Sequence, residues 1–310
     1  MMQTQSTLWV CRVPVATVWN APDKARDIDA EGLSAEGRIN NWIEAMNAEQ
    51  TRDLMESERV ETQLLYGEPV EIDEISDGWA KITATWQPSG KDERGYPGWV
   101  PVAQLEEVEL IRESGFVRVI TMHAQLWTVD FKPLATIPFN ALLPIKETGE
   151  YVRVQTPDGD AFISGNQVEI VSQFQDSMIG TGRNIAESAE EFLNLQYFWG
   201  GMSSYGYDCS GLTFNIMKAN GIRISRDAGD QAWEGKAVDQ HSPESWWKGD
   251  LLFFADDNGR AAVRHVGIYY GNGLMVHSPT AGKAIEIIEI AGTKYANELC
   301  AVRRFTEIQE

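Results

Sequence analysis

In the first third of the chain, short stretches of mainly apolar residues are separated by polar and turn residues. This pattern predicts short β-strands at residues 7–21, 62–66, 70–72, 78–82 and 95–101. Residues 23–60 differ, because they are charged, rich in Ala, Glu, Met and Asn, and poor in β-branched residues. We interpret them as an insertion, with a helix predicted over residues 40–58. Short strands joined by turns are typical of a small barrel.

The strand pattern recurs further along the chain. Ala124–Trp127 resembles Ala16–Trp19, and residues 150–163 repeat the arrangement of residues 78–101. A repeat of about 60 residues, with the insertion set aside, predicts two related β domains over residues 1–109 and 110–172. Most aromatic residues of this part, including Trp79 and Trp99, are interpreted as barrel core.

A different pattern follows a mostly polar linker at residues 173–182. Helices are predicted at residues 185–195 and from Asp208 to Asn220. Strands are predicted at 250–254, 265–270, 274–277, 284–288 and 300–305, with Gly271–Gly273 as a hairpin turn. Helices followed by an antiparallel sheet indicate an α+β domain over residues 183–310, and therefore a multidomain protein.

Cys209 stands on the first turn of the second predicted helix. Asp208 is a suitable N-cap, and Gly221 is a suitable C′ residue. The unpaired N–H groups and the dipole at a helix start favour a thiolate, which is the nucleophilic form of cysteine. The alternative is a small buried apolar cysteine, the commoner fate of this residue.

His265 and His277 flank the predicted hairpin and so lie near each other on adjacent strands. They share a face only if the pairing register is even, as a three-residue loop with a bulge would give. In that case His265 can be the general base for Cys209, and His277 can hold its imidazole in the useful tautomer. The alternative is two hairpin histidines satisfied by backbone groups. His123 and His241 lie in polar, unpatterned contexts and are expected to be exposed.

Composition narrows the class of partner. The chain carries 46 acidic and 26 basic residues, a formal charge of −20, which argues against nucleic acid and against anionic membranes or wall polymers. Its three cysteines lie far apart, with no disulfide framework and no zinc-binding spacing. The N-terminus lacks a cationic segment followed by an apolar one, so a cytoplasmic location is expected, although a precursor trimmed earlier would look the same.

Five motifs, in this order, resemble those of the NlpC/P60 cysteine peptidases: Tyr197-x-Trp199-Gly200-Gly201, Asp208-Cys209-Ser210-Gly211, Gly249-Asp250-Leu251, His265-Val266-Gly267-Ile268-Tyr269 and His277-Ser278. The match runs over residues 183–306. The resemblance implies a papain-like fold with Cys209 as nucleophile, His265 as base and His277 as the third polar residue. It also implies that Tyr197 helps stabilise the oxyanion alongside backbone N–H groups. It implies no cofactor and no metal.

Residues 5–172 resemble bacterial SH3-like (SH3b) domains. Two such domains before the peptidase are similar to the γ-D-glutamyl-L-diamino acid endopeptidases of murein-peptide recycling, which cut peptides that have a free N-terminal L-Ala. The resemblance implies that Glu61 and Tyr96 of the first SH3b domain contact the peptidase domain to close the cleft, where Asp227 completes an amine pocket. Further substrate-binding residues are expected at Asp208, Ser210 and Ala228.

The predicted function is therefore a cytoplasmic cysteine endopeptidase acting on small L-Ala-γ-D-Glu-diamino acid peptides. Two rivals remain open at this point: a secreted hydrolase whose SH3b domains bind intact peptidoglycan, and a non-catalytic binding protein on a peptidase fold. A solvated Glu61 and a barrel-edge Tyr96 are likewise alternatives to the amine pocket. The role of the 23–60 insertion is open.

Overall fold

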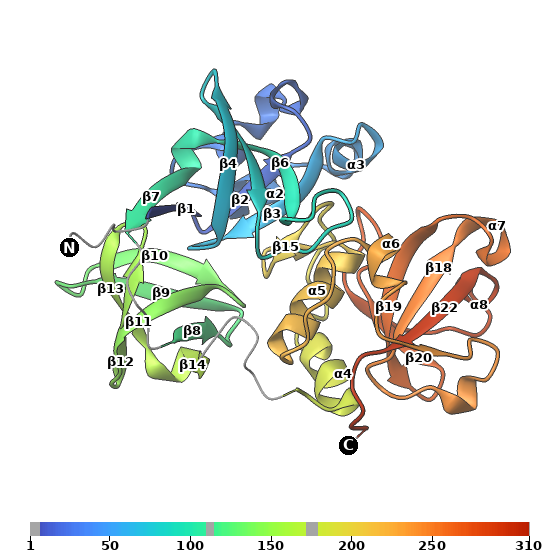
Figure 1. The fold of residues 1–310 in the computed structure, drawn as a ribbon. Helices are drawn as coiled ribbons and strands as arrows, with labels where there is room; N and C mark the ends of the chain where they lie inside the picture. The colour runs from blue at the N-terminus through green and yellow to red at the C-terminus, as the bar shows by residue number, and fades with distance from the viewer. Residues whose placement is uncertain (1–6, 110–114, 172–178, 310) are drawn as a thin grey trace. The chain divides into compact units, whose positions relative to one another are not determined.

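The computed structural model describes residues 7–109, 115–171 and 179–309 (Figure 1). These residues form two compact units. The first unit comprises the described residues up to Gln87, those from Lys91 to Val171, and the segment Met202–Tyr205. The second unit comprises Pro88–Gly90, residues 179–201 and residues 206–309. Each unit has its own β-sheet core.

The first unit begins with a seven-stranded antiparallel sheet in the order β3-β2-β6-β5-β4-β1-β7. Its strands are β1 (Thr7–Cys11), β2 (Val15–Trp19), β3 (Val60–Leu65), β4 (Pro69–Ser76), β5 (Trp79–Ala84), β6 (Tyr96–Pro101) and β7 (Leu105–Glu109), the last preceded by the 3-10 turn η3 (Val102–Gln104). The strands predicted between residues 7 and 101 are confirmed.

Alternation along β5 and β6 decides which aromatic residues reach the core of this sheet. Ala80 and Ile82 on β5 and Val100 on β6 are fully buried in the core. Trp79 and Trp99 stand next to them in sequence and therefore point to the opposite face of the sheet. Both tryptophans are only half-buried, so their interpretation as barrel core was wrong.

A second seven-stranded sheet in the same unit has the order β10-β9-β13-β12-β11-β8-β14. Adding seven to each strand number of the first sheet gives this order, so the two sheets share one topology and the predicted repeat is confirmed. The strands are β8 (Phe116–Val119), β9 (His123–Thr128), β10 (Pro133–Pro138), β11 (Leu142–Glu147), β12 (Tyr151–Thr156), β13 (Gly159–Ser164) and β14 (Val168–Val171), the last preceded by η4 (Gly165–Gln167).

The insertion between β2 and β3 is helical but broken. It contains the short turns η1 (Pro22–Lys24) and η2 (Asp27–Asp29) and the helices α1 (Ala30–Leu33), α2 (Ile39–Ala45) and α3 (Ala48–Glu56). One continuous helix over residues 40–58 was a wrong prediction, because Asn47 caps a new helix. Its side chain accepts from the N–H groups of Glu49 and Gln50, while the Gln50 side chain accepts from the Asn47 N–H.

Trp42 anchors the insertion to the first sheet. Its ring is fully buried and packs at 5.9 Å from the ring of Trp19 on β2, and its indole N–H donates to Asp29 at 2.9 Å. The insertion therefore belongs to the packed structure of this domain.

The second unit joins two main helices to a six-stranded antiparallel sheet in the order β17-β22-β18-β19-β20-β21. The helices are α4 (Gly182–Glu190), α5 (Cys209–Ala219), α6 (Ala228–Gln231), α7 (Asp256–Gly259) and α8 (Tyr295–Glu298), with the turn η5 (Pro243–Ser245). The sheet strands are β17 (Lys236–Val238), β18 (Leu251–Ala255), β19 (Val263–Gly271), β20 (Leu274–His277), β21 (Glu286–Glu289) and β22 (Leu299–Arg304). Two short strands, β15 (Met202–Ser203) of the first unit and β16 (Gly206–Tyr207) of the second, precede α5.

These elements confirm the predicted class, two antiparallel β domains followed by an α+β domain. One helix end differs from the prediction. Helix α4 ends at Glu190 rather than near Leu195, and Asn194 adopts a left-handed conformation with φ of 70°. A positive φ cannot continue an α-helix, so the chain turns before the Tyr197 motif.

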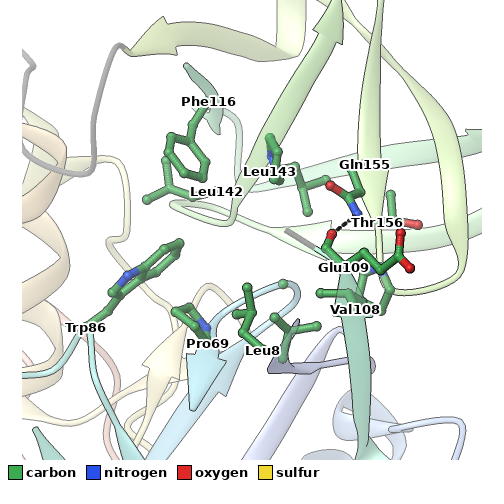
Figure 2. A pocket seen from close by; sticks show the side chains of 14 residues that line it. Leu8, Pro69, Trp86, Val108, Glu109, Phe116, Leu142, Leu143, Gln155 and Thr156 are labelled. Carbon is green, nitrogen blue, oxygen red and sulfur yellow. Dashed lines mark hydrogen bonds between the residues drawn. The ribbon is translucent and has the colours of Figure 1, made fainter. Parts of the chain in front are cut away.

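Between its two sheets the first unit has a cavity of about 210 Å³ (Figure 2). Leu8 and Pro69 line it from one sheet, Trp86 lines it from the turn after β5, and Phe116 and Leu142 line it from the other sheet. At its edge the Gln155 side chain donates to the Glu109 carbonyl oxygen at 2.9 Å. The walls are mainly apolar, and no residue predicted to bind substrate or to catalyse lines the cavity.

Within the described ranges no helix has both the length and the hydropathy needed to cross a bilayer.

Candidate active site

Helix α5 presents Cys209 as its first residue. The Asp208 carboxylate accepts from the Gly211 N–H at 2.6 Å, which makes Asp208 the N-cap as predicted. At the other end Asn220 is the C-cap, and Gly221 has φ of 73°, the left-handed conformation of a C′ glycine. The helix packs against β19 of the sheet, the strand that carries His265.

His265 and His277 meet in the interior of the second unit. The Nε2 atom of His265 and the Nδ1 atom of His277 are 2.7 Å apart, and the two residues are only 3% and 1% exposed. The β19–β20 register shifts between Tyr269 and Gly271, which is the bulge that the even register required. The shared face is therefore confirmed, and the alternative that both imidazoles bond only to backbone groups was wrong.

A glycine makes room for this pair. Gly267 lies two residues after His265 on β19, and a Cβ atom there would come within 3.2 Å of the His277 Cβ and 3.1 Å of the Met275 sulfur. Such contacts are tighter than packed side chains normally accept. The Gly267 position of the His-Val-Gly-Ile-Tyr motif thus lets the neighbouring strand approach closely enough for the two imidazoles to touch.

The surroundings of Cys209 favour the neutral form of its thiol. Cys209 keeps part of its surface accessible, but dense surroundings desolvate it and raise its pKa to about 12, and the negative charge of Asp208 acts in the same direction. The Val266 backbone on β19, the strand against which α5 packs, opposes the shift. Burial therefore opposes the thiolate that the sequence predicts at the helix start, and that thiolate stays a prediction.

His265 is also neutral in this environment. Burial holds its pKa well below the ordinary value, and the positive charges near it, on Arg264 and Lys294, act in the same direction together with His277. A neutral imidazole on the strand against which the Cys209 helix packs is suited to remove the thiol proton as the sulfur attacks, rather than to form an ion pair beforehand.

Tyr197 lies in the same electrostatic neighbourhood. Its residue is 6% exposed, and its backbone N–H donates to the Lys283 carbonyl oxygen at 2.9 Å. Burial raises the pKa of its phenol well above the ordinary value, and the negative charge of Asp208, like that of Cys209 whenever its thiol ionises, acts in the same direction. The hydroxyl therefore stays protonated and able to donate, as the predicted oxyanion role requires.

Arg226, which the sequence did not reveal, neutralises Asp208. Its guanidinium donates to both oxygens of Asp208, at 2.6 and 3.2 Å, and to the Ser210 hydroxyl at 2.8 Å. The ion pair is almost completely buried, so removal of either partner would leave an uncompensated charge. Asp208 and Ser210 are thereby tied into the start of α5, and their role in substrate binding stays a prediction.

Asp227 and Ala228 follow Arg226 at the start of α6. The Asp227 carbonyl oxygen accepts from the N–H groups of Asp230 and Gln231, and its carboxylate makes no capping bond to the helix. Asp227 is half-buried and Ala228 is 9% exposed. The second unit thus carries eight of the predicted site residues: Tyr197, Asp208, Cys209, Ser210, Asp227, Ala228, His265 and His277.

Glu61 and Tyr96 belong to the first unit, where they contact each other. The Tyr96 hydroxyl donates to Glu61 Oε2 at 3.1 Å, and the Lys91 ammonium donates to both side chains. Burial alone would raise the pKa of Glu61, but Lys91, Asn20 and Tyr96 hold it below the ordinary value. Tyr96 is 2% exposed and Glu61 is half-buried, so a barrel-edge tyrosine and a solvated glutamate were wrong alternatives.

Lys91 was not foreseen, since it stands in a loop without periodic pattern. Its ammonium lies 4.5 Å from the centre of the Tyr96 ring as well as on the Glu61 carboxylate. The predicted amine-binding carboxylate therefore already has a cationic partner from its own chain. A substrate ammonium at Glu61 would have to share or displace this contact.

Tyr295 on α8 is a further residue that sequence reasoning missed. Its ring stacks on His265 at a centroid distance of 5.3 Å and meets the His277 ring edge-on at 5.1 Å. It also packs at 5.0 Å against Phe254 of β18. One buried aromatic ring thus contacts both histidines and limits how either imidazole can rotate.

We expect Tyr295→Leu to lower kcat by about 10-fold while Tyr295→Phe stays close to the unmodified protein, because ring contacts of this kind contribute about 1 kcal/mol beyond simple burial. Tyr269→Leu is the matched control, since Tyr269 is similarly buried in the same apolar cluster but packs on Trp246 instead of the histidines. Steady-state kinetics and melting curves of the three variants check this. Equal losses of kcat in Tyr295→Leu and Tyr269→Leu would assign Tyr295 to general packing.

The remaining histidines lie elsewhere. His241 is exposed as expected. His123 was expected to be exposed but is half-buried against the Tyr205 ring at 4.5 Å, and burial lowers its pKa. All three cysteines are free. Across the described residues, no group of three or more His, Cys, Asp or Glu side chains is arranged to hold a metal ion.

Comparison with known proteins matches this site to a family. Residues 194–304 match the model of the NlpC/P60 family. The crystal structure of an NlpC/P60 family protein from Bacillus cereus superimposes on 97% of this chain and 99% of its own, with a TM-score of 0.90 and 33% identity. The chain belongs to the NlpC/P60 family. It is an NlpC/P60 peptidase, and residues 55–105 match the model of the bacterial dipeptidyl-peptidase Sh3 domain.

Two curated relatives cover nearly the whole chain. The γ-D-glutamyl-L-lysine dipeptidyl-peptidase of Bacillus subtilis is 40% identical over 94% of this chain and 96% of its own length. The γ-D-glutamyl-L-lysine dipeptidyl-peptidase of Bacillus cereus is 36% identical over 94% of this chain and 89% of its own. The similarity therefore includes the two β domains as well as the peptidase domain.

Proposed function

We propose that this NlpC/P60 peptidase hydrolyses the bond between γ-D-Glu and a diamino acid in murein peptides, releasing the dipeptide L-Ala-D-Glu. The observation that carries the proposal is the similarity along almost the entire chain to two Bacillus γ-D-glutamyl-L-lysine dipeptidyl-peptidases. The contact between His265 and His277 beside the Cys209 helix supplies the chemistry that such a reaction needs.

In the proposed reaction the Cys209 sulfur attacks the side-chain carbonyl carbon of D-Glu while His265 takes the thiol proton. The carbonyl oxygen becomes an oxyanion, to which the Tyr197 hydroxyl and the N–H groups at the start of α5 donate. His265 then gives its proton to the nitrogen of the departing diamino acid, leaving a thioester. A water molecule, deprotonated by His265, hydrolyses the thioester and restores the thiol.

For the substrate's free N-terminus we propose recognition by carboxylates. An ammonium taken out of water needs a negative or hydrogen-bonded partner. Each unit offers its own candidate: Asp227 in the second unit, and Glu61 with the Tyr96 hydroxyl in the first. In intact peptidoglycan the L-Ala nitrogen is an uncharged amide with bulk attached, which would leave these carboxylates uncompensated. The net charge of −20 also disfavours an anionic wall polymer.

The test compares L-Ala-γ-D-Glu-L-Lys with its N-acetylated form and with intact sacculi, with products identified by mass spectrometry. We expect acetylation to lower kcat/KM by at least about 100-fold, since a desolvated charge pair contributes about 2–5 kcal/mol. Glu61→Gln and Asp227→Asn are each expected to lower kcat/KM for the free peptide and so to reduce the difference in kcat/KM between the free and the acetylated peptide. Glu106→Gln, which removes a half-exposed carboxylate of the same sheet, serves as the control.

Equal cleavage of free and acetylated peptides, or release of fragments from sacculi, would instead favour a wall hydrolase that uses its SH3b domains to bind peptidoglycan. We further propose that the enzyme acts in the cytoplasm, where it cleaves small released murein peptides during their recycling. Cell fractionation tests that part of the proposal independently of the kinetics.

A further inference from the structure

The contact between the two histidines contains a choice between two tautomers. Only one proton can lie between His265 Nε2 and His277 Nδ1, which are 2.7 Å apart. If His265 donates, its Nδ1 is unprotonated and can accept a proton from Cys209. If His277 donates, the neutral His265 carries its proton on Nδ1, and its remaining lone pair is occupied by His277. Only the first arrangement leaves His265 able to act as a base.

The other nitrogen of His277 faces a carboxylate. His277 Nε2 is buried and, within the part of the chain that the structure describes, has no hydrogen-bond partner. Glu286 Oε1 lies 3.6 Å from it, because Glu286 on β21 is the direct cross-strand neighbour of His277 on β20. The Glu286 side chain is 41% exposed, so it has room to adjust its position.

We propose that Glu286 is a positioning residue that selects the reactive tautomer of the histidine pair. A carboxylate next to Nε2 attracts a proton on that atom and repels a lone pair there. His277 then carries its proton on Nε2 and accepts through Nδ1 from His265 Nε2–H. The His265 Nδ1 lone pair is left to receive the proton of Cys209. This inference rests on the roles of Cys209 and His265 in the proposed function.

Glu286 also supplies the negative charge that the pair otherwise lacks. The charged groups that act on the two histidines from the neighbouring elements are cationic: Arg264 on β19, and Lys283 and Lys294 in the segments flanking β21. Burial and these lysines lower the pKa of His277 to about 4. Arg264 is itself paired with Asp256 and Glu298. When His265 accepts the thiol proton, a carboxylate beside His277 stabilises the positive charge that is shared across the hydrogen bond.

The tautomers can be read directly in the resting protein by ¹⁵N NMR, because the chain has only four histidines. We expect both His265 and His277 of the unmodified protein to carry their protons on Nε2. Glu286→Ala is expected to shift both toward Nδ1–H and to lower kcat by about 10-fold with little change in KM, the size of effect seen when a carboxylate that orients a histidine is removed. Glu286→Gln keeps an acceptor oxygen, so it should retain the tautomer and most of the activity.

Glu289→Ala is the matched control, since it removes the same charge from the exposed end of the same strand. Its tautomers and kinetics should equal those of the unmodified protein. Nδ1–H tautomers in the unmodified protein, or an unchanged tautomer in Glu286→Ala, would overturn the inference. If the tautomers shift as expected but the unmodified protein cleaves no γ-D-glutamyl peptide, the proposed function fails while the assignment of Glu286 stands.

Discussion

Replacing Cys209 with alanine is expected to lower kcat by at least about 10⁴-fold, because no other group can form the thioester and single losses from such a catalytic unit remove most of its effect. The fold should persist. The substitution is small, it lies at the first position of α5, and the N-cap contact of Asp208 with Gly211 does not involve the sulfur. Steady-state kinetics on the free tripeptide, together with a melting curve, measure both effects.

Cys300→Ala is the matched control for this experiment. Cys300 is a half-buried cysteine of β22 in the same unit, and its thiol donates to the Phe253 carbonyl oxygen. The Cys300→Ala variant should retain its activity, with a loss of stability similar to that of Cys209→Ala. Substantial turnover in Cys209→Ala would remove Cys209 as the nucleophile.

Replacing His265 with alanine is expected to lower kcat nearly as much, by about 10³-fold or more. The pKa of Cys209 is raised to about 12, so at neutral pH almost no thiolate forms without a base to take its proton. The same variant should slow alkylation of Cys209 by iodoacetamide, measured by mass spectrometry of the Cys209 peptide. That readout does not depend on the identity of the substrate.

His277→Asn should be milder, because an amide can partly replace an imidazole that only orients its neighbour. His241→Ala is the control, since His241 is exposed and outside the site. His123 packs on Tyr205, which is not a candidate catalytic residue. If His123→Ala lowered kcat as much as His265→Ala, that result would contradict the assignment of His265 as the base. Alkylation at the unmodified rate in His265→Ala would do the same.

Local patterns in the sequence were sufficient for the architecture. Short strand-forming runs between turn residues predicted β1 to β6 of the first sheet, although not β7. The similarity of residues 150–163 to 78–101 predicted the repeat that the shared strand order confirms. The capping residues Asp208 and Gly221, recognised from the sequence, predicted both ends of α5. The prediction of one helix over residues 40–58 was wrong, because Asn47 and Gln50 form a capping box that begins a new helix within a stretch of helix-favouring composition.

For the candidate site, too, local sequence predicted some properties and packing decided others. The family motifs placed Cys209, Tyr197, His265 and His277 because each stands in a short stretch of chain with its own pattern. Their protonation depends on what surrounds them: at Cys209 burial raises the pKa of the thiol, which acts against the thiolate that a helix start favours. Burial is a property of the packed domain, to which residues distant in sequence contribute.

The amino-acid sequence by itself determined the order of the domains and the start of the nucleophile helix, since both depend on residues close together in the chain. It left the register of the histidine hairpin open, and the bulge between Tyr269 and Gly271 decided it. The tertiary structure alone decided the partners of the site: Arg226 on Asp208, Lys91 on Glu61, Tyr295 on both histidines and Glu286 beside His277. These residues stand in loops, in a four-residue helix and on a short strand, and carry no periodic signal. Only packing brings their charges and rings within reach of the site, where desolvation gives such contacts their effect.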